Sequence, residues 1–179
     1  MINQPYLVGD CLGLDPRSLV QSLQSYFFLQ EPLQKQQFLF HFEPWLDWES
    51  LGAILPRTVL SKAPNHLYLC PEAGPNFERA KQTLSLLQSK LHTLITLIII
   101  PEPLNSTEQK EFQLALAQEF NLKPLRFDWA CQEFLDKHLQ NTQDQMALVT
   151  GQPPKLSLLG SLLFAQEIWK DHCHHSQIS

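Results

Sequence analysis

The chain has 179 residues, of which 44% are hydrophobic and 17% are charged, and its formal net charge is −5. This length and composition predict one folded domain, which we assign to residues 1–172, followed by a flexible tail at 173–179. The acidic balance and the lack of a Lys/Arg cluster exclude a typical nucleic-acid-binding surface. The longest apolar run, at 94–100, is too short to span a membrane.

The N-terminal region has no basic and apolar segments of the kind that make a secretory signal. The four cysteines, Cys11, Cys70, Cys131 and Cys173, are widely spaced and form no C-x-x-C pair. These features indicate unpaired thiols in a reducing compartment, so we expect a cytoplasmic protein. The glycine patterns of dinucleotide and phosphate-binding loops are missing, and we expect no cofactor.

Strands and helices are predicted in alternation along the chain. Apolar or alternating runs predict strands, and apolar residues spaced by three and four predict helices. The expected strands are 6–8, 37–42, 65–70, 93–100, 123–127 and 145–149. The expected helices are 15–29, 44–55, 76–91, 105–120 (with Ser106 and Gln109 in capping-box spacing), 129–139 and 156–172.

This alternation predicts right-handed crossovers and a mainly parallel sheet with helices on both faces. The fold class is therefore α/β, a three-layer α/β/α sandwich of the flavodoxin-like kind. We expect the run at 93–100 to be the most buried strand, because it is apolar on both faces.

The first candidate site is the turn Gly9-Asp10-Cys11-Leu12, which follows the first strand. Ligands of open parallel sheets bind at the carboxyl ends of the strands, where this turn is expected to lie. A cysteine at a helix N-terminus gains thiolate character. However, cysteine is also among the most buried residue types, so Cys11 is either a reactive group or a small core residue.

The histidines suggest a second candidate. The segment Asp-His-Cys-His-His at 171–175 is dense in possible metal ligands. It lies at the end of the last helix, where chains are usually loose, so we favour a solvated tail and expect no metal site. We interpret His41, His66 and His92 as structural, and His138 as stabilised by the dipole at a helix C-terminus.

The order of these parts resembles the SGNH (GDSL) hydrolases, which are small α/β/α esterases and thioesterases. Their first block, G-D-S-[LI], is similar to Gly9-Asp10-Cys11-Leu12, with cysteine in place of the nucleophilic serine. The resemblance continues weakly through 80–103 and 112–134. It ends in the segment 150–169, which is similar to the block in which D-x-x-H-P precedes a long terminal helix.

The resemblance also implies where the catalytic groups belong, and several are replaced. The Asp and His of the final block fall on Thr150 and Pro153. The oxyanion-hole Gly falls near Pro44, which has no N–H to donate. The oxyanion-hole Asn has either Asn76 or no counterpart. Acyl transfer needs both a base and oxyanion donors, so these changes imply that the chemistry is lost.

Two functional hypotheses follow. The first is a non-catalytic, SGNH-like binding or interaction module whose partner is a protein or a small acyl-type ligand, the latter carried in the former active-site cleft. The second is an esterase or thioesterase in which Cys11 is the nucleophile, Asp10 and Asn76 belong to its site, and the base is His138, His172 or His174.

Overall fold

The computed structural model describes residues 5–9, 41–43, 48–54, 64–70, 77–91, 93–101, 104, 106–138, 148–151 and 155–176. The helix expected at 15–29 lies outside these residues. The other expected helices and all six expected strands fall at least partly within them.

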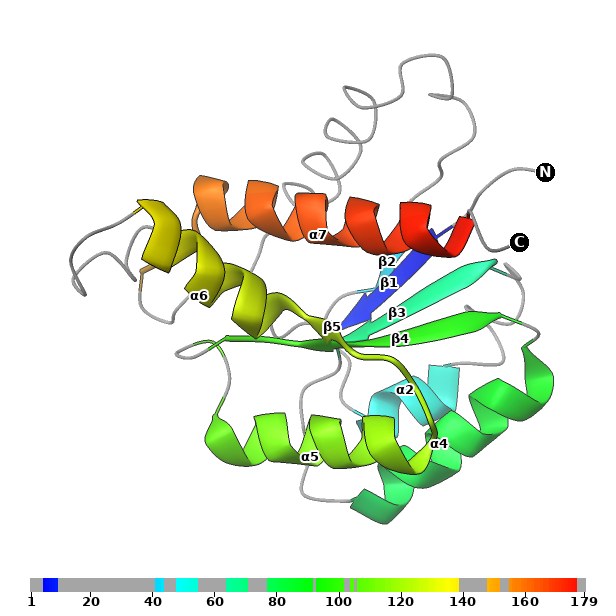
Figure 1. Cartoon of the computed structure of the whole chain (residues 1–179). Helices are drawn as coiled ribbons and strands as arrows, with labels where there is room; N and C mark the ends of the chain where they lie inside the picture. The colour runs from blue at the N-terminus through cyan, green and yellow to red at the C-terminus, as the bar shows by residue number, and fades with distance from the viewer. Residues whose placement is uncertain are drawn as a thin grey trace.

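A five-stranded parallel sheet forms the centre of the molecule (Figure 1). Its strands are β1 (Pro5–Gly9), β2 (His41–Glu43), β3 (His66–Cys70), β4 (Leu94–Ile99) and β5 (Leu125–Arg126). They lie in the order β2-β1-β3-β4-β5, and every neighbouring pair is parallel. The chain adds β2 on one side of β1 and β3 on the other, which places a topological switch point between β1 and β3.

Helices cover both faces of this sheet (Figure 1). One layer contains α2 (Trp48–Ile54), α4 (Phe77–Lys90) and α5 (Thr107–Glu119). The other contains α6 (Phe127–His138) and α7 (Leu158–Ser176). The predicted three-layer α/β/α architecture is confirmed.

The alternation of side chains along the strands divides the core in two. From β3, Leu67 and Leu69 pack with Trp48 and the buried faces of α4 and α5. From the same strand, Tyr68 and Cys70 pack with the side chains of α6 and α7. The sheet is therefore apolar on both faces, as expected of a parallel sheet between helices.

Two predictions about strands are wrong in detail. All five residues of β3 are buried, whereas Leu94 of β4 is 39% exposed, so β4 is not the most buried strand. The reason is position, because β3 lies at the centre of the sheet. The strand expected at 145–149 is β6 (Val149–Thr150), which pairs antiparallel with β7 (Lys155–Leu156) in a separate two-stranded hairpin.

The last helix is longer than expected. It continues to Ser176, so residues 173–176, which we assigned to a tail, are helical. No glycine or proline interrupts the sequence after Gly160. The terminal turns also pack on the sheet, because His172 is buried and Asp171 contacts β3. The solvated tail predicted from Asp171 is therefore wrong for these turns.

Candidate functional site

The switch point between β1 and β3 is where the fold places a ligand or an active site. Gly9, the last residue of β1, pairs with Cys70, the last residue of β3. Asp10 and Cys11 follow Gly9 in the chain, and Asn76 immediately precedes the first residue of α4. These three candidate residues lie outside the described part of the chain, so their roles stay predictions.

The resemblance seen in the sequence puts the base-bearing loop of an SGNH hydrolase at residues 150–153, between the strands of the β6–β7 hairpin. Thr150 pairs with Lys155, which leaves residues 151–154 as the connection. Gly151 begins it with a φ of 81°, a conformation that glycine adopts without strain. The connection Gly-Gln-Pro-Pro contains no side chain that exchanges a proton near neutral pH.

Close contacts hold this hairpin against the start of α7. The Ser157 amide donates a hydrogen bond to the Leu148 carbonyl over 2.8 Å. The Ser157 hydroxyl accepts one from the Gly160 amide, as an N-cap residue does. A Cβ placed on Gly160 would lie 2.3 Å from the Leu148 oxygen, so only glycine fits. The start of α7 thus holds the two ends of the hairpin, at Leu148 and Ser157.

Several of the described histidines belong to the opposite edge of the sheet, where the strands begin. His41 and His66 are the first residues of β2 and β3, whereas His92 lies outside the described residues. The end of α7 packs at this edge, since the rings of His66 and His172 are 6.0 Å apart. His174 and His175 follow in the same helix. Five residues of β3 separate this edge from the switch point, a distance of about 13 Å.

His138, the remaining histidine, is the last residue of α6. That helix begins at the carboxyl end of β5 and is 12 residues long, so its two ends are about 16–18 Å apart. His138 stacks on Phe134 of the same helix at a centroid distance of 4.7 Å. It therefore lies one helix length from the end of the sheet.

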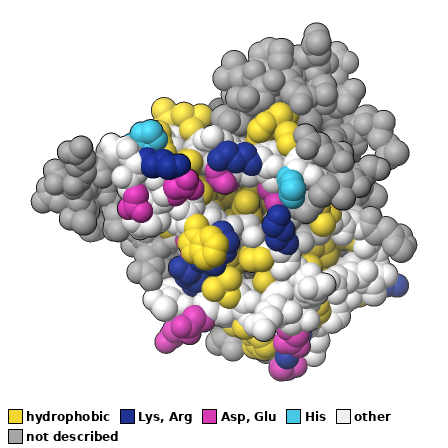
Figure 2. Space-filling view, viewed as in Figure 1, with side chains coloured by type: hydrophobic (Ala, Val, Ile, Leu, Met, Phe, Trp, Pro, Cys, Tyr) yellow, Lys and Arg dark blue, Asp and Glu magenta, His cyan; other side chains and the backbone are white. Residues whose placement is uncertain are grey.

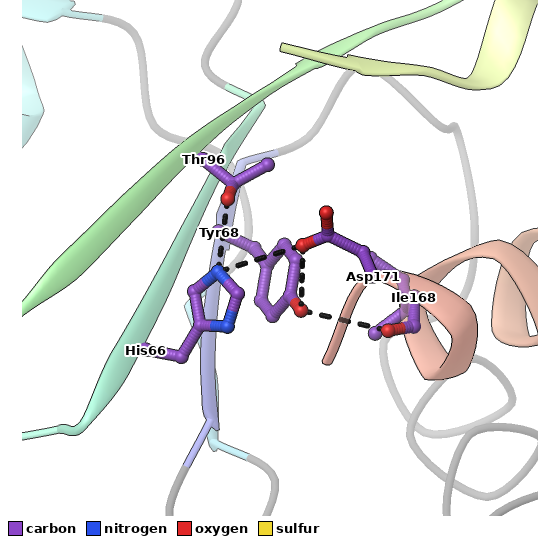
Figure 3. Close-up of polar contacts among 5 residues, drawn as sticks. All are labelled: His66, Tyr68, Thr96, Ile168 and Asp171. Carbon is purple, nitrogen blue, oxygen red and sulfur yellow. Dashed lines mark hydrogen bonds and ion pairs between the residues drawn. The ribbon is translucent and has the colours of Figure 1, made fainter. Parts of the chain in front are cut away.

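A polar cluster fills the amino edge beneath α7 (Figure 3). His66 Nε2 lies 2.9 Å from Thr96 Oγ1 and 3.7 Å from Asp171 Oδ2. The Tyr68 hydroxyl donates to Asp171 Oδ2 over 3.2 Å and approaches the Ile168 carbonyl at 3.5 Å. Burial, followed by the charge and the hydrogen bond of Asp171, raises the pKa of Tyr68 well above its usual value.

This cluster contains a hydroxyl, an imidazole and a carboxylate, but it does not have the geometry of a catalytic triad. A triad places the nucleophile and the carboxylate on different imidazole nitrogens. Here Thr96 and Asp171 both approach Nε2 of His66 (Figure 3). Thr96 and His66 are each 2% exposed, which closes the cluster to a substrate. Its role is to join α7 to β3 and β4, and the structural interpretation of His66 agrees with this packing.

A cavity of about 350 Å³ opens at the carboxyl edge, between β4, α5 and the first half of α6. Its wall combines apolar side chains and a buried thiol with polar side chains and an indole. Its lining comprises Pro101, Cys131, Leu135, Leu148 and Val149, with Lys110, Asp128, Trp129 and Gln132. Sequence reasoning missed this cavity, because its walls come from four separate segments.

Asp128 organises the charged side of the cavity. It accepts two hydrogen bonds from Arg126, at 2.8 and 2.7 Å, and its Oδ2 lies 2.7 Å from Lys110 Nζ. Burial raises the pKa of this carboxyl, but the hydrogen bonds from Arg126 and Lys110 outweigh it and hold the pKa below its usual value. The Arg126 guanidinium also lies 3.7 Å from the ring centre of Trp129, a cation–π contact that orients the indole.

Two of the three described cysteines are core residues. Cys70 and Cys131 are buried and Cys173 is partly buried, and none of the three forms a disulfide within the described residues. Burial and the nearby charges of Asp128 and Glu167 raise the pKa of Cys131 to about 12, so this thiol is not a nucleophile near neutral pH. Within the described part of the chain, no three His, Cys, Asp or Glu side chains form a metal site, and no helix is long and apolar enough to cross a membrane.

No family model matches this chain, and no curated protein matches it by sequence. Solved structures do match its fold. An acetylxylan esterase from Geobacillus stearothermophilus is 15% identical with a TM-score of 0.67, and 94% of this chain and 93% of that chain are covered. A lipase/acylhydrolase from Enterococcus faecalis is 13% identical with a TM-score of 0.70, over 94% of each chain.

A GDSL-like protein from Parabacteroides merdae is 14% identical with a TM-score of 0.65, over 93% of each chain. At such identities the similarity is one of fold, and it covers nearly the whole chain. The strand order, the three layers and these matches agree with the resemblance seen in the sequence. The chain therefore has the α/β/α fold of the GDSL-type (SGNH) esterases and lipases.

Proposed function

We propose that this chain is a non-catalytic, SGNH-like binding module that keeps the hydrolase fold and has lost the hydrolytic chemistry. The observation that carries the proposal is the position of the histidines. The histidines that the structure describes lie at the amino edge or at the far end of α6. Both places are away from the switch point at the carboxyl ends of β1 and β3, and Cys11 comes two residues after the last residue of β1. A general base must come within hydrogen-bond reach of the proton it removes.

The replaced residues support the same proposal. The hairpin connection carries Pro153 where the resemblance places the catalytic histidine, and Thr150 stands at the position of the aspartate. Pro44, near the position of an oxyanion-hole glycine, has no N–H. General acid–base assistance is typically worth about 10²–10⁴-fold, and one oxyanion donor about 10²–10³-fold. Together these losses leave no measurable turnover.

The alternative is a cysteine esterase or thioesterase that uses Cys11 with His138, His172 or His174. His172 packs against His66 at the amino edge, and His174 lies two residues further along the same helix. His138 lies at the far end of α6. The arrangement of the described residues thus favours the non-catalytic module over the enzyme.

Hydrolysis assays distinguish the two functions. We expect purified protein to hydrolyse p-nitrophenyl acetate, p-nitrophenyl butyrate and acyl-CoA thioesters no faster than its Cys11→Ala variant. His138→Gln and His172→Gln variants serve as matched controls for the bases of the alternative. Turnover that is abolished by Cys11→Ala and by one of the histidine variants would establish the enzyme and refute the binding module.

We also propose a cytoplasmic location. The cysteines that the structure describes are not disulfide-bonded, which suits a reducing compartment. A disulfide in the purified, unreduced chain would contradict this location.

A further inference from the structure

The cavity beside α6 points to a particular class of ligand. We propose that it binds a small carboxylic acid, with the carboxylate on Lys110 and the apolar part against Leu135, Leu148 and Val149. This inference rests on the proposed function, because it names the ligand of a module that binds rather than hydrolyses. None of the described residues that line the cavity belongs to β1 or β3, so ligand binding there and hydrolysis by Cys11 can be tested independently.

The size and position of the cavity suit a small ligand. Its volume, about 350 Å³, is at the lower end of the range for ligand pockets, about 300–1,000 Å³. It lies at the carboxyl edge of the sheet, where open α/β folds bind their ligands. Leu148 and Val149 line it and are buried. Apolar walls with a few polar groups at one side are typical of such pockets.

The charge beside the cavity favours an anion. Lys110 and Asp128 line the cavity, and Arg126, which is not part of the lining, also binds Asp128. The three side chains together carry a net charge of +1. An ammonium has three donors, and within the described residues Lys110 uses one of them, on Asp128. The Lys110 side chain is 34% exposed, whereas that of Asp128 is 5% exposed and already paired. A carboxylate would therefore approach Lys110 and complete its set of hydrogen bonds.

The indole beside the cavity is held in place before any ligand arrives. Trp129 is 63% exposed, which is unusual for so large an apolar ring. The Arg126 guanidinium lies 3.7 Å from the centre of the Trp129 ring. Arg126 also donates two hydrogen bonds to Asp128, which hold the guanidinium in this position. Hydrophobic and basic side chains lie next to one another on this face (Figure 2). A fixed aromatic wall lowers the entropy cost of binding an apolar chain or ring.

Titration calorimetry of the native protein with sodium hexanoate, sodium benzoate and neutral hexanamide tests the proposal. We expect saturable 1:1 binding of the two acids in the micromolar-to-millimolar range and hexanamide binding at least about tenfold weaker. Lys110→Met should weaken hexanoate binding about tenfold or more and leave hexanamide binding unchanged. The Lys110→Arg variant should bind hexanoate with an affinity within about threefold of that of the native protein, because arginine keeps the positive charge.

Lys90→Met is the matched control, because Lys90 is an exposed lysine at the end of α4, a helix that contributes no residue to the described lining of the cavity. It should bind hexanoate as the native protein does. Equal affinities of the native protein for hexanoate and hexanamide, or no binding of either acid at millimolar concentration, would overturn the proposal even if Lys110→Met fails to fold. Ester hydrolysis would refute the proposed function without bearing on this binding, so the two failures are distinguishable.

Discussion

The two edges of the sheet use polar side chains in different ways. At the amino edge, His66, Tyr68 and Asp171 contact one another in a closed, buried cluster that ties α7 to the sheet. At the carboxyl edge, Lys110 and Asp128 form an ion pair that lines an open cavity. The amino edge has the residue types of a catalytic site but is closed to a substrate. The carboxyl edge has a cavity that a small molecule can enter. Residue types therefore indicate chemistry only after the topology has placed them.

The contrast between the two edges depends first on the contact between α7 and the β6–β7 hairpin, because Leu148 and Val149 of the hairpin line the cavity at the carboxyl edge. A Gly160→Ala variant places a methyl group 2.3 Å from the Leu148 carbonyl oxygen, so α7 or the hairpin must shift. We expect it to lower the free energy of unfolding by about 3 kcal/mol, at the upper end for overpacking and despite the better helix propensity of alanine. Urea denaturation measures this change.

Gly52→Ala is the matched control for that variant. Its Cβ would lie 3.0 Å from Thr83 Oγ1, a side-chain atom and a longer approach than the 2.3 Å at Gly160. We expect a change within about 1 kcal/mol, since the gain in helix propensity offsets the close contact. Equal stabilities of Gly160→Ala and the native protein would show that the packing of α7 does not hold the hairpin at Leu148.

The ion group at the carboxyl edge gives the second prediction. Asp128→Asn keeps the shape of the side chain but leaves Arg126 and Lys110 without their carboxylate. We expect a loss of about 2 kcal/mol in the free energy of unfolding at neutral pH, within the range for hydrogen bonds to charged groups. Glu133→Gln, which removes an exposed ion pair with Lys137, should leave the free energy of unfolding close to that of the native protein.

The same carboxyl also gives a pH dependence. The pKa of Asp128 is lower in the folded protein than its ordinary value of 3.8. Its stabilising contribution is therefore complete above that value and is lost as the pH falls through the folded-state pKa. Urea denaturation between pH 5 and 2, at about half-unit steps, should show a steeper loss for the native protein than for Asp128→Asn. Parallel curves would contradict the assigned ion group.

Sequence patterns predicted the layers of this fold and much of its detail. The Ser106–Gln109 capping box is present at the start of α5, and the apolar spacing of 76–91 became α4. Such local signals suffice because a parallel sheet between helices permits few arrangements. The extent of α7 was missed, because its last turns are polar and their stability comes from His66 and Tyr68, which lie 100 residues earlier.

The site was harder to predict than the fold. The cavity joins Pro101, Lys110, Trp129 and Leu148, which share no motif and meet only in three dimensions. The Arg126–Asp128 pair was visible as a local Arg-Phe-Asp-Trp segment, but its partner Lys110 lies in a different layer. His66 and His172 meet at one edge because α7 packs on β3, a contact between distant segments that no local pattern indicates.

The smallest expected effect tests whether the amino edge is purely structural. Tyr68→Phe removes the hydroxyl that donates to Asp171, and we expect a loss of about 1 kcal/mol in the free energy of unfolding near pH 7. The raised pKa of Tyr68 adds an alkaline signature. Above the ordinary value near 10, only the unfolded state releases the proton, so the native protein loses up to about 1.4 kcal/mol per pH unit through this group.

The Tyr68→Phe variant lacks that proton, so its free energy of unfolding should decline less steeply between pH 10 and 11 than that of the native protein. The difference in free energy of unfolding between the two proteins should therefore shrink over this range. Thr96→Val is the matched control, because it removes a contact of His66 in the same cluster and leaves the Tyr68 hydroxyl in place. It should keep the native alkaline slope. If Tyr68→Phe and the native protein declined in parallel, Tyr68 would ionise as easily folded as unfolded. The amino edge would then be open to solvent, and the contrast between the two edges would fail.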